Sequence, residues 1–385
     1  MKTNRQVKLL SIAFMLVFFG FTAAQQYVTT FFDSLGLPSV GFNSLAILYL
    51  FFTVFSAVAG TIVSRYGARK VMLVSVLFYS LFIASLTTGY VYLVYIASAL
   101  AGIAAATLWV SQGSYIIRLS GKRSYGTNTG FFSAIQSFGT VIGIFIAGFL
   151  INLYLFKPTF LFLLTFPLLA LIPLYLLEDI RPKPKNNTLY MVRKSLTNPL
   201  ALRIGLFRLS SYFVLGIVVG ILPIEIKNLL GIVYIGPLST LFYAIPIALT
   251  YFFGRGSDLV GRMKMVPYSY IISILGLAIL FFAGSLAWFV IGIVFLALSS
   301  AILGPVSAAL IGDISTEKNL ESIASLFWIM SSMGIVISTF ISSILISKWA
   351  YLVAIIAMVI SLFLMVPLLR SNLNRVKSEL ARQIR

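Results

Sequence analysis

Apolar residues occur in long runs along this chain, separated by short breaks that contain glycine, proline or charged residues. A helix needs about 20 apolar residues to cross the hydrocarbon region of a bilayer. The pattern predicts an all-α integral membrane protein with twelve transmembrane helices. With boundaries good to a few residues, the runs lie near 8–32, 40–64, 70–88, 91–117, 127–151, 157–177, 201–224, 234–257, 264–284, 286–312, 321–347 and 349–370.

The longest break, 178–200, divides the runs six and six and is rich in charged residues. We therefore expect two six-helix bundles joined by a cytoplasmic linker. The expected domains are an N-terminal bundle over 1–177, the basic linker over 178–200, a C-terminal bundle over 201–370 and a basic cytoplasmic tail over 371–385.

Positive charge is distributed unevenly between the two sides. Of the 28 lysines and arginines, 24 fall in the tails and in the loops on the side of the termini. Lys157, Lys227 and Lys348 fall on the other side, and Arg208 lies inside a run. Cytoplasmic loops carry such an excess of lysine and arginine. The pattern predicts a multi-pass protein of the cell membrane with both termini cytoplasmic, and it explains the net charge of +19 without a nucleic-acid partner.

Composition narrows the possible chemistry. Hydrophobic residues make up 60% of the chain, which contains neither cysteine nor histidine. Disulfides, thiolate metal sites and imidazole catalysis are therefore excluded. We expect no metal, no cofactor and no enzymatic activity. The basic N-terminus leads into a long run without a small-residue cleavage site, which favours a spanning helix over a signal peptide.

The two halves share sequence at a nearly constant offset. GTIVSRYGARK (60–70) and GRGSDLVGRMK (254–264) lie 194 residues apart. GFFSAIQSFGTVI (130–142) aligns with SLFWIMSSMGIVI (325–337) at an offset of 195. Two matches in the same order predict a duplicated six-helix unit, with the copies related by a pseudo-twofold axis along the membrane normal.

This repeated loop resembles the signature of the major facilitator superfamily, in which a glycine is followed four residues later by an acid, then by a second glycine and basic residues. In that family the loop latches the halves on the cytoplasmic side in the outward-facing state. Ser64 stands where the acid is expected in the first copy, which implies a weaker latch. The motif positions are Gly60, Ser64, Arg65, Gly67, Arg69, Lys70, Gly254, Asp258, Gly261, Arg262 and Lys264.

Within the superfamily, the chain is most similar to the branch named after the uncoordinated-ninety-three (UNC93) proteins. The likeness lies in SLGLPSVGFNSLAILYLFF (34–52) with the following loop, and in ATLWVSQGSYIIRLS (106–120). Described members of that branch are mostly accessory or trafficking proteins that act on other membrane proteins. The resemblance therefore implies the superfamily fold and leaves open a regulatory protein with a membrane-protein partner.

Polar side chains inside the runs are the candidates for substrate binding, because such groups are costly in lipid. The candidates are Gln25, Trp109, Gln112, Tyr115, Gln136, Arg208 and Trp328. Helix packing through interhelical hydrogen bonds is the alternative for the aromatic and amide residues. Arg208 is expected either to bind an anion or to extend to the lipid headgroups.

Acidic residues are missing from the middle of the runs. Asp33 and Glu225 lie at the outer ends of the first and seventh runs, and the other acids lie in or beside cytoplasmic loops. A relay of protons through buried carboxylates is therefore disfavoured. The favoured function is alternating-access transport of a small organic solute that is neutral or anionic, by a protein embedded in the lipid bilayer. The alternative is a non-transporting regulatory or trafficking protein.

Overall fold

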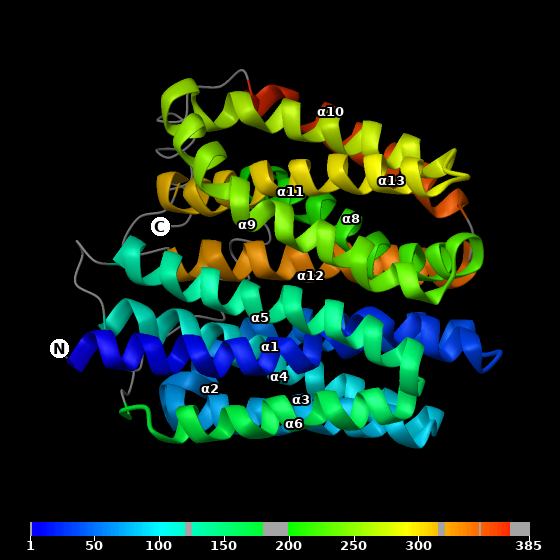
Figure 1. Cartoon of the computed structure of the whole chain (residues 1–385). Helices are drawn as coiled ribbons and strands as arrows, with labels where there is room; N and C mark the ends of the chain where they lie inside the picture. Colours follow the sequence, from blue (N-terminus) through cyan, green and yellow to red (C-terminus); the bar gives the residue numbers. More distant parts are fainter. Residues whose placement is uncertain (1, 120–124, 180–198, 315–319, 346–347, 370–385) are drawn as a thin grey trace. The chain divides into compact units, whose positions relative to one another are not determined.

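The structure is a computed structural model. It describes residues 2–119, 125–179, 199–314, 320–345 and 348–369, which form α-helices, one short 3-10 helix and the turns between them (Figure 1). The chain divides into two compact units. Unit 1 comprises Met1–Asn186 and Gly231–Thr240, and unit 2 comprises Asn187–Leu230 and Leu241–Arg385.

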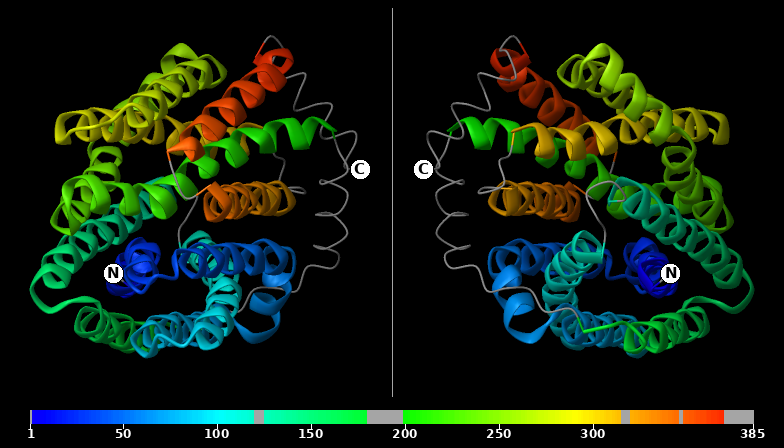
Figure 2. Two further views of the ribbon diagram at one scale, coloured as in Figure 1. Left: turned by 90° about the vertical axis from the view of Figure 1, so that its right-hand side faces the viewer. Right: turned by 90° about the vertical axis from the view of Figure 1, so that its left-hand side faces the viewer.

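The long helices of each unit run side by side, and Figure 2 shows them from their ends. Unit 1 contains α1 (Lys2–Ser34), α2 (Pro38–Tyr66), α3 (Ala68–Thr88), α4 (Val91–Leu119), α5 (Tyr125–Tyr154) and α6 (Phe156–Tyr175). It also contains η1 (Ile232–Tyr234) and the first residues of α9 (Ile235–Val260). Unit 2 contains α8 (Pro199–Leu230), the rest of α9, α10 (Arg262–Phe281), α11 (Leu286–Ile314), α12 (Leu320–Leu345) and α13 (Trp349–Leu369).

Every predicted run corresponds to a helix. In the described part of the chain, 11 helices are long and apolar enough to cross a membrane. The helix α13 corresponds to the last predicted run, and its described apolar segment, Trp349–Met365, is shorter. The all-α, multi-pass prediction is confirmed. The predicted domain boundaries stay predictions, because residues 180–198 of the linker and the whole tail lie outside the described residues.

Two predicted boundaries were wrong by more than a few residues: the first run was placed from 8, yet α1 begins at Lys2, and the end of the seventh run was also misplaced. The seventh run was placed at 201–224, yet α8 continues to Leu230. The predicted end was placed just before Glu225 and Lys227. Charged residues do not end a helix by themselves, because they leave its main-chain hydrogen bonds intact. The interruption comes at Gly231, whose φ of 100° lies in the left-handed region that glycine adopts without strain.

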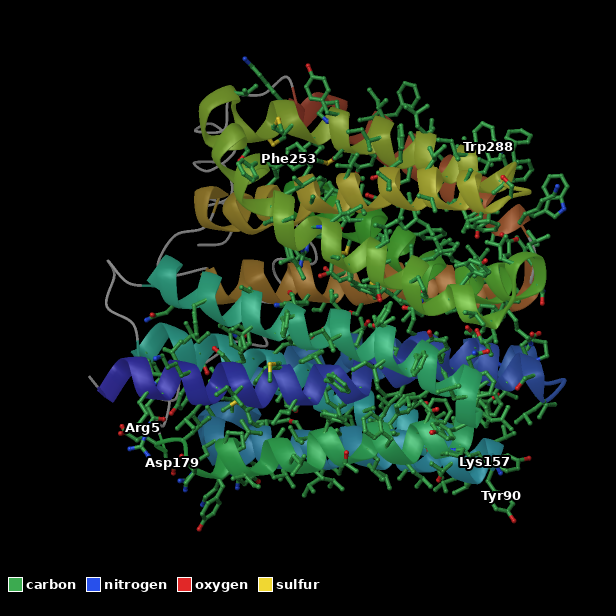
Figure 3. The ribbon with its side chains drawn as sticks, viewed as in Figure 1. Arg5, Tyr90, Lys157, Asp179, Phe253 and Trp288 are labelled. Carbon is green, nitrogen blue, oxygen red and sulfur yellow. The ribbon has the colours of Figure 1, made fainter. Side chains whose placement is uncertain are left out.

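Successive turns of unit 1 lie at alternate ends of its helices. Arg5 and Asp179 lie at one end of the unit, and Tyr90 and Lys157 lie at the other (Figure 3). The cation-rich turn between α2 and α3 is on the Arg5 side, because α2 runs back from the end that α1 reaches. The concentration of positive charge at one end of this unit follows from the chain's up-and-down course. Its cytoplasmic location stays a prediction.

The repeated loop has the same backbone in both halves. Gly67 joins α2 to α3 with φ 86° and ψ 143°, and Gly261 joins α9 to α10 with φ 103° and ψ 126°. The Gly67 N–H donates to the Val63 carbonyl at 2.9 Å, and the Gly261 N–H donates to the Ser257 carbonyl at 3.0 Å. Since other residues rarely adopt such φ values, the glycines are required for this turn. The offset of 194 residues found in the sequence is therefore also an offset in backbone conformation.

Four helix pairs of unit 1 have counterparts in unit 2. In unit 1, α1 packs on α5 and α6, and α3 packs on α4 and α6; in unit 2, α8 packs on α12 and α13, and α10 packs on α11 and α13. At the first of these crossings, a Cβ added to Gly139 would collide with the Met15 carbonyl oxygen. A Cβ added to Gly334 would collide in the same way with the Leu209 carbonyl oxygen. Small residues allow such close backbone approach in membranes.

We predict that Gly139→Ala and Gly334→Ala each destabilise the protein by about 1–3 kcal/mol, because the new methyl group meets rigid main chain rather than a side chain that can rotate. Thermal unfolding in detergent measures the effect. Gly113→Ala is the matched control, because Gly113 also lies within a helix and an added Cβ there has nothing within 4 Å. Equal melting temperatures for all three variants would contradict the proposed packing.

Candidate functional site

Arg208 on α8 is held by hydroxyl groups from three helices of unit 2. Its Nε donates to Ser331 Oγ on α12 at 3.1 Å, and its Nη1 donates to Ser307 Oγ on α11 at 2.9 Å. Its Nη2 donates to the Tyr212 hydroxyl, one turn further along α8, at 3.4 Å. These bonds hold the half-buried guanidinium against α11 and α12.

Two aromatic rings lie close to the same guanidinium. The Arg208 Cζ lies 4.8 Å from the ring centroid of Tyr212 and 5.5 Å from that of Trp328 on α12. A cation within about 6 Å of a ring centroid is attracted by the negative face of the ring. Trp328, a predicted substrate residue, therefore lies beside Arg208.

The surroundings of Arg208 fix its position without neutralising its charge. Ser307 donates its own proton to the Gly304 carbonyl at 2.9 Å, and Ser331 donates to the Phe327 carbonyl at 2.6 Å. The serine oxygens therefore present lone pairs to the guanidinium. In the described part of the chain, no carboxylate forms an ion pair with Arg208. Ionisable groups within membrane spans normally pair with a partner or serve a function.

In unit 1, the predicted residue Trp109 belongs to an aromatic cluster. Its ring centroid lies 5.9 Å from that of Phe14 and 5.2 Å from that of Phe18, both on α1. Phe14 also meets Phe132 of α5 edge to face, at 5.0 Å. The cluster joins α1, α4 and α5, which agrees with the packing alternative for Trp109.

Two predicted glutamines of unit 1 lie in the C-terminal half of α4 and the N-terminal half of α5. Gln136 donates to Thr140 on its own helix at 3.3 Å, so its amide does not connect two helices in that bond. Gln112 is 8% exposed. Its side-chain amide makes no hydrogen bond to any of the residues that the structure describes. Of the two, Gln112 has the greater unused capacity to bind a ligand.

The repeat relates these residues to the Arg208 group. The helices α4 and α11 begin 195 residues apart, at Val91 and Leu286. The same offset takes Gln112 to Ser307 and Gln136 to Ser331, and the offset of 194 takes Phe14 to Arg208. Ser307 and Tyr212 were missed from the sequence, and Ser331 was not selected as a ligand. The repeat pairs Ser307 and Ser331 with predicted residues of unit 1, and this pairing is the sequence signal that points to both serines.

Gln25 and its neighbour bond in different directions. The Gln25 Nε2 donates to the Tyr49 hydroxyl at 2.6 Å, which joins α1 to α2. The Gln26 Nε2 donates to Ser239 Oγ at 3.1 Å, in the part of α9 that belongs to unit 1. The Gln25 amide therefore links two helices, and its contact with a substrate stays a prediction.

Tyr115 lies near the C-terminal end of α4 and holds the segment that follows α6. Its hydroxyl donates to Gln6 Oε1 at 2.9 Å and contacts the Glu178 carbonyl at 3.1 Å. Gln6 Oε1 in turn accepts the Glu178 N–H at 3.1 Å. The Arg69 Nη1 donates to the Leu177 carbonyl at 3.0 Å, beside this group. The Tyr115 hydroxyl thus links α4 to α1, and its predicted contact with a substrate stays a prediction.

The other positions of the repeated loop are placed as follows. Arg65 is exposed and its Cζ lies 5.6 Å from the Tyr66 ring centroid. Lys70 and Lys264 are exposed, and Gly60 lies in the last turns of α2. Ser64 lies in α2, Gly254 and Asp258 lie in α9, and Arg262 lies in α10, but what surrounds these four residues is outside the described part of the structure. The predicted latch between halves stays a prediction.

A metal site has no support among the described residues. They contain no group of three or more Asp, Glu, His or Cys side chains close enough to share an ion. The expectation that the protein uses no cofactor stays a prediction.

Comparison with known proteins decides the family. Residues 9–208 and 204–383 each match the sequence model of the Major Facilitator Superfamily, so nearly the whole chain is covered. The chain belongs to the Major Facilitator Superfamily. The double match also agrees with the internal repeat. The protein is therefore a multi-pass membrane protein of a superfamily built from duplicated helical units.

Similar proteins support the predicted likeness to the UNC93 branch. UNC93-like protein MFSD11 from Xenopus laevis is 32% identical over 153 residues, which are 39% of this chain and 33% of that protein. The protein of the same name from Xenopus tropicalis is 36% identical over 138 residues, 35% of this chain and 31% of that protein. UNC93-like protein 3 from Arabidopsis thaliana is 34% identical over 142 residues, 37% of this chain and 28% of that protein. The matches span 28–33% of the relatives' length, so they confirm a likeness and not a shared activity.

A solved structure confirms the superfamily fold. The crystal structure of a POT family transporter in complex with 5-aminolevulinic acid has a TM-score of 0.77 and covers 95% of this chain and 97% of that chain. The sequence identity is 11%, so the likeness concerns the fold alone. Family and fold are those of secondary transporters and point away from an enzyme.

We predict that Tyr115→Phe destabilises the protein by about 1–2 kcal/mol, because Gln6 Oε1 loses a buried hydrogen-bond donor. The thermal unfolding temperature measures the loss, and Tyr268→Phe is the control because Tyr268 is exposed. Substrate binding by Tyr115 makes the opposite prediction: reduced transport with an unchanged unfolding temperature.

Proposed function

We propose that the protein is a secondary transporter of a small organic solute, neutral or anionic, and that its two helical units operate by alternating access. Family membership and the transporter fold support this class of function. The observation that supports a solute site is Arg208, a cation within a membrane span that hydroxyl groups position and no described carboxylate neutralises.

A charged arginine side chain within a membrane span raises the free energy of the folded protein. A charged residue at the centre of a span costs about 2.5–3.5 kcal/mol even on the scales that give the lowest values, and Arg208, in the first turn of the described span Gly205–Leu230, costs part of that. Ser307 and Ser331 are placed to orient the guanidinium, but they supply no negative charge. An arrangement that only stabilised the helix pairing would be served better by neutral residues. Binding of a polar or anionic solute explains why the cation is present.

The proposed location is the cell membrane, with both termini in the cytoplasm. The bias of positive charge toward one side supports it, since 24 of the 28 lysines and arginines occur on the side of the termini. The proposed partners are the lipid bilayer and a small-molecule substrate, without nucleic acid. Among the candidate substrate residues, Gln112, Arg208 and Trp328 have the strongest support. No enzymatic activity is proposed.

The second candidate is a regulatory or trafficking protein that does not transport and that binds another membrane protein. The likeness to proteins named UNC93-like favours it. Ser64 favours it as well, because it replaces the acid of the first copy of the loop.

Transport by the purified protein in liposomes distinguishes the two candidates. We predict saturable uptake of at least one solute when the liposomes are offered pools of small neutral and anionic metabolites. We further predict that Arg208→Gln lowers this uptake at least about tenfold, because hydrogen bonds to a charged group contribute about 1.5–3 kcal/mol.

Arg5→Gln is the matched control, since it removes an exposed arginine of unit 1 and should leave uptake unchanged. Absence of saturable uptake for every pool, from protein that unfolds cooperatively, would contradict transport and favour the regulatory candidate.

A further inference from the structure

We propose that Arg208 binds the carboxylate of an organic monocarboxylate, and that such monoanions are the substrate class. This inference rests on the proposed transport function. It narrows a neutral or anionic solute to one chemical class with one negative charge.

Among the residues that the structure describes, the hydrogen bonds of Arg208 leave two of its N–H donors unused. A guanidinium has five N–H donors, one on Nε and two on each terminal nitrogen. Ser331, Ser307 and Tyr212 accept one bond each from Nε, Nη1 and Nη2. One N–H therefore remains on each terminal nitrogen. A carboxylate accepts two parallel N–H bonds from such a pair.

The charge balance favours a ligand with a single negative charge. Ser307, Ser331 and Tyr212 are neutral, so the bound carboxylate is the group that compensates the guanidinium. One carboxylate makes the complex neutral. A dicarboxylate or a doubly ionised phosphate would leave an uncompensated charge in surroundings of low dielectric constant, which is costly. Glu225, on the same helix, is 17 residues further along, at a distance of about 25 Å.

The duplication places this charge in one unit only. The position equivalent to Arg208 in unit 1 is Phe14, whose neighbours Trp109 and Phe132 are aromatic. The positions equivalent to Ser307 and Ser331 are the neutral residues Gln112 and Gln136. The equivalent positions of unit 1 therefore carry no charge, and Arg208 is the one cation at these positions of the repeat.

The rings beside Arg208 favour a ligand that is apolar beyond its carboxylate. Tyr212 and Trp328 lie 4.8 Å and 5.5 Å from the Arg208 Cζ, as measured to their ring centroids. Both rings attract the guanidinium through their negative faces and present apolar surface beside it. A lysine in this place would keep the charge but lose the paired donors.

Binding to three matched sets of ligands tests the proposal. The purified full-length protein is titrated with benzoate and hexanoate, with the dianions phthalate and adipate, and with the neutral amides benzamide and hexanamide. The rise in unfolding temperature reports binding, and uptake into liposomes of phosphatidylcholine reports transport. We expect a monocarboxylate to bind at least tenfold more tightly than the dianion and the amide built on the same ring or chain.

Two arginine variants separate charge from geometry. Arg208→Gln should abolish the preference for the monocarboxylate over the amide. Arg208→Lys, which retains a cation, should raise the Kd of the monocarboxylate at least tenfold. Arg5→Lys is the control and should change neither value.

Three outcomes would overturn the inference. Amides or dianions that bind as tightly as the monocarboxylates would exclude a site for one carboxylate. Uptake of neutral metabolites only would overturn it and leave the proposed transport intact, whereas absence of all uptake would be a failure of the transport function itself. Competition by phosphatidylglycerol in the liposomes, with a proportional rise in Kd, would assign Arg208 to a lipid phosphate.

Discussion

The hydrocarbon core of a bilayer offers no water to hydrogen-bond with, and this constraint governs the whole structure. Every main-chain group in a span must find its partner within the protein, so the spans are helices. The same constraint acts on hydroxyl groups. Ser11, Ser75 and Ser80 each donate to a carbonyl one turn back in their own helix, at 2.8, 2.8 and 3.0 Å. Polar side chains satisfied in this way need no ligand. Arg208 differs from them, because the hydroxyl partners that the structure describes leave its positive charge without a counter-charge.

Duplication preserved the scaffold of the two units and allowed their polar residues to diverge. Gly67 and Gly261 retain one turn geometry, and Gly139 and Gly334 retain one helix crossing, because a side chain would strain each turn and collide with main chain at each crossing. Side chains nearby were free to change. Phe14 lies in an aromatic cluster, whereas Arg208 lies among hydroxyl groups. The copies thus keep the same backbone and differ in chemistry.

Most of the fold was predictable from the sequence, because the length of apolar runs reports directly on helices that cross a bilayer. The end of α8 was not, since the decisive residue was Gly231 and not the preceding charges. The position of Arg208 was predictable as the one cation inside a run. Its partners were not, because Ser307 and Tyr212 are common residues whose meaning depends on which helices meet. Spacing along α4 grouped Tyr115 with Trp109, while the structure gives its hydroxyl to Gln6 and Glu178.

The glycine crossings have a consequence for how the units respond to their surroundings. Where Gly139 faces the Met15 carbonyl and Gly334 faces the Leu209 carbonyl, the glycine directs a Cα–H toward an oxygen. Such contacts contribute about 0.5–1 kcal/mol each. They involve no ionised group, so neither ionic strength nor the lipid headgroup charge screens them. The pairing of α1 with α5 and of α8 with α12 is therefore independent of salt, unlike any interaction of the cationic loops at the helix ends.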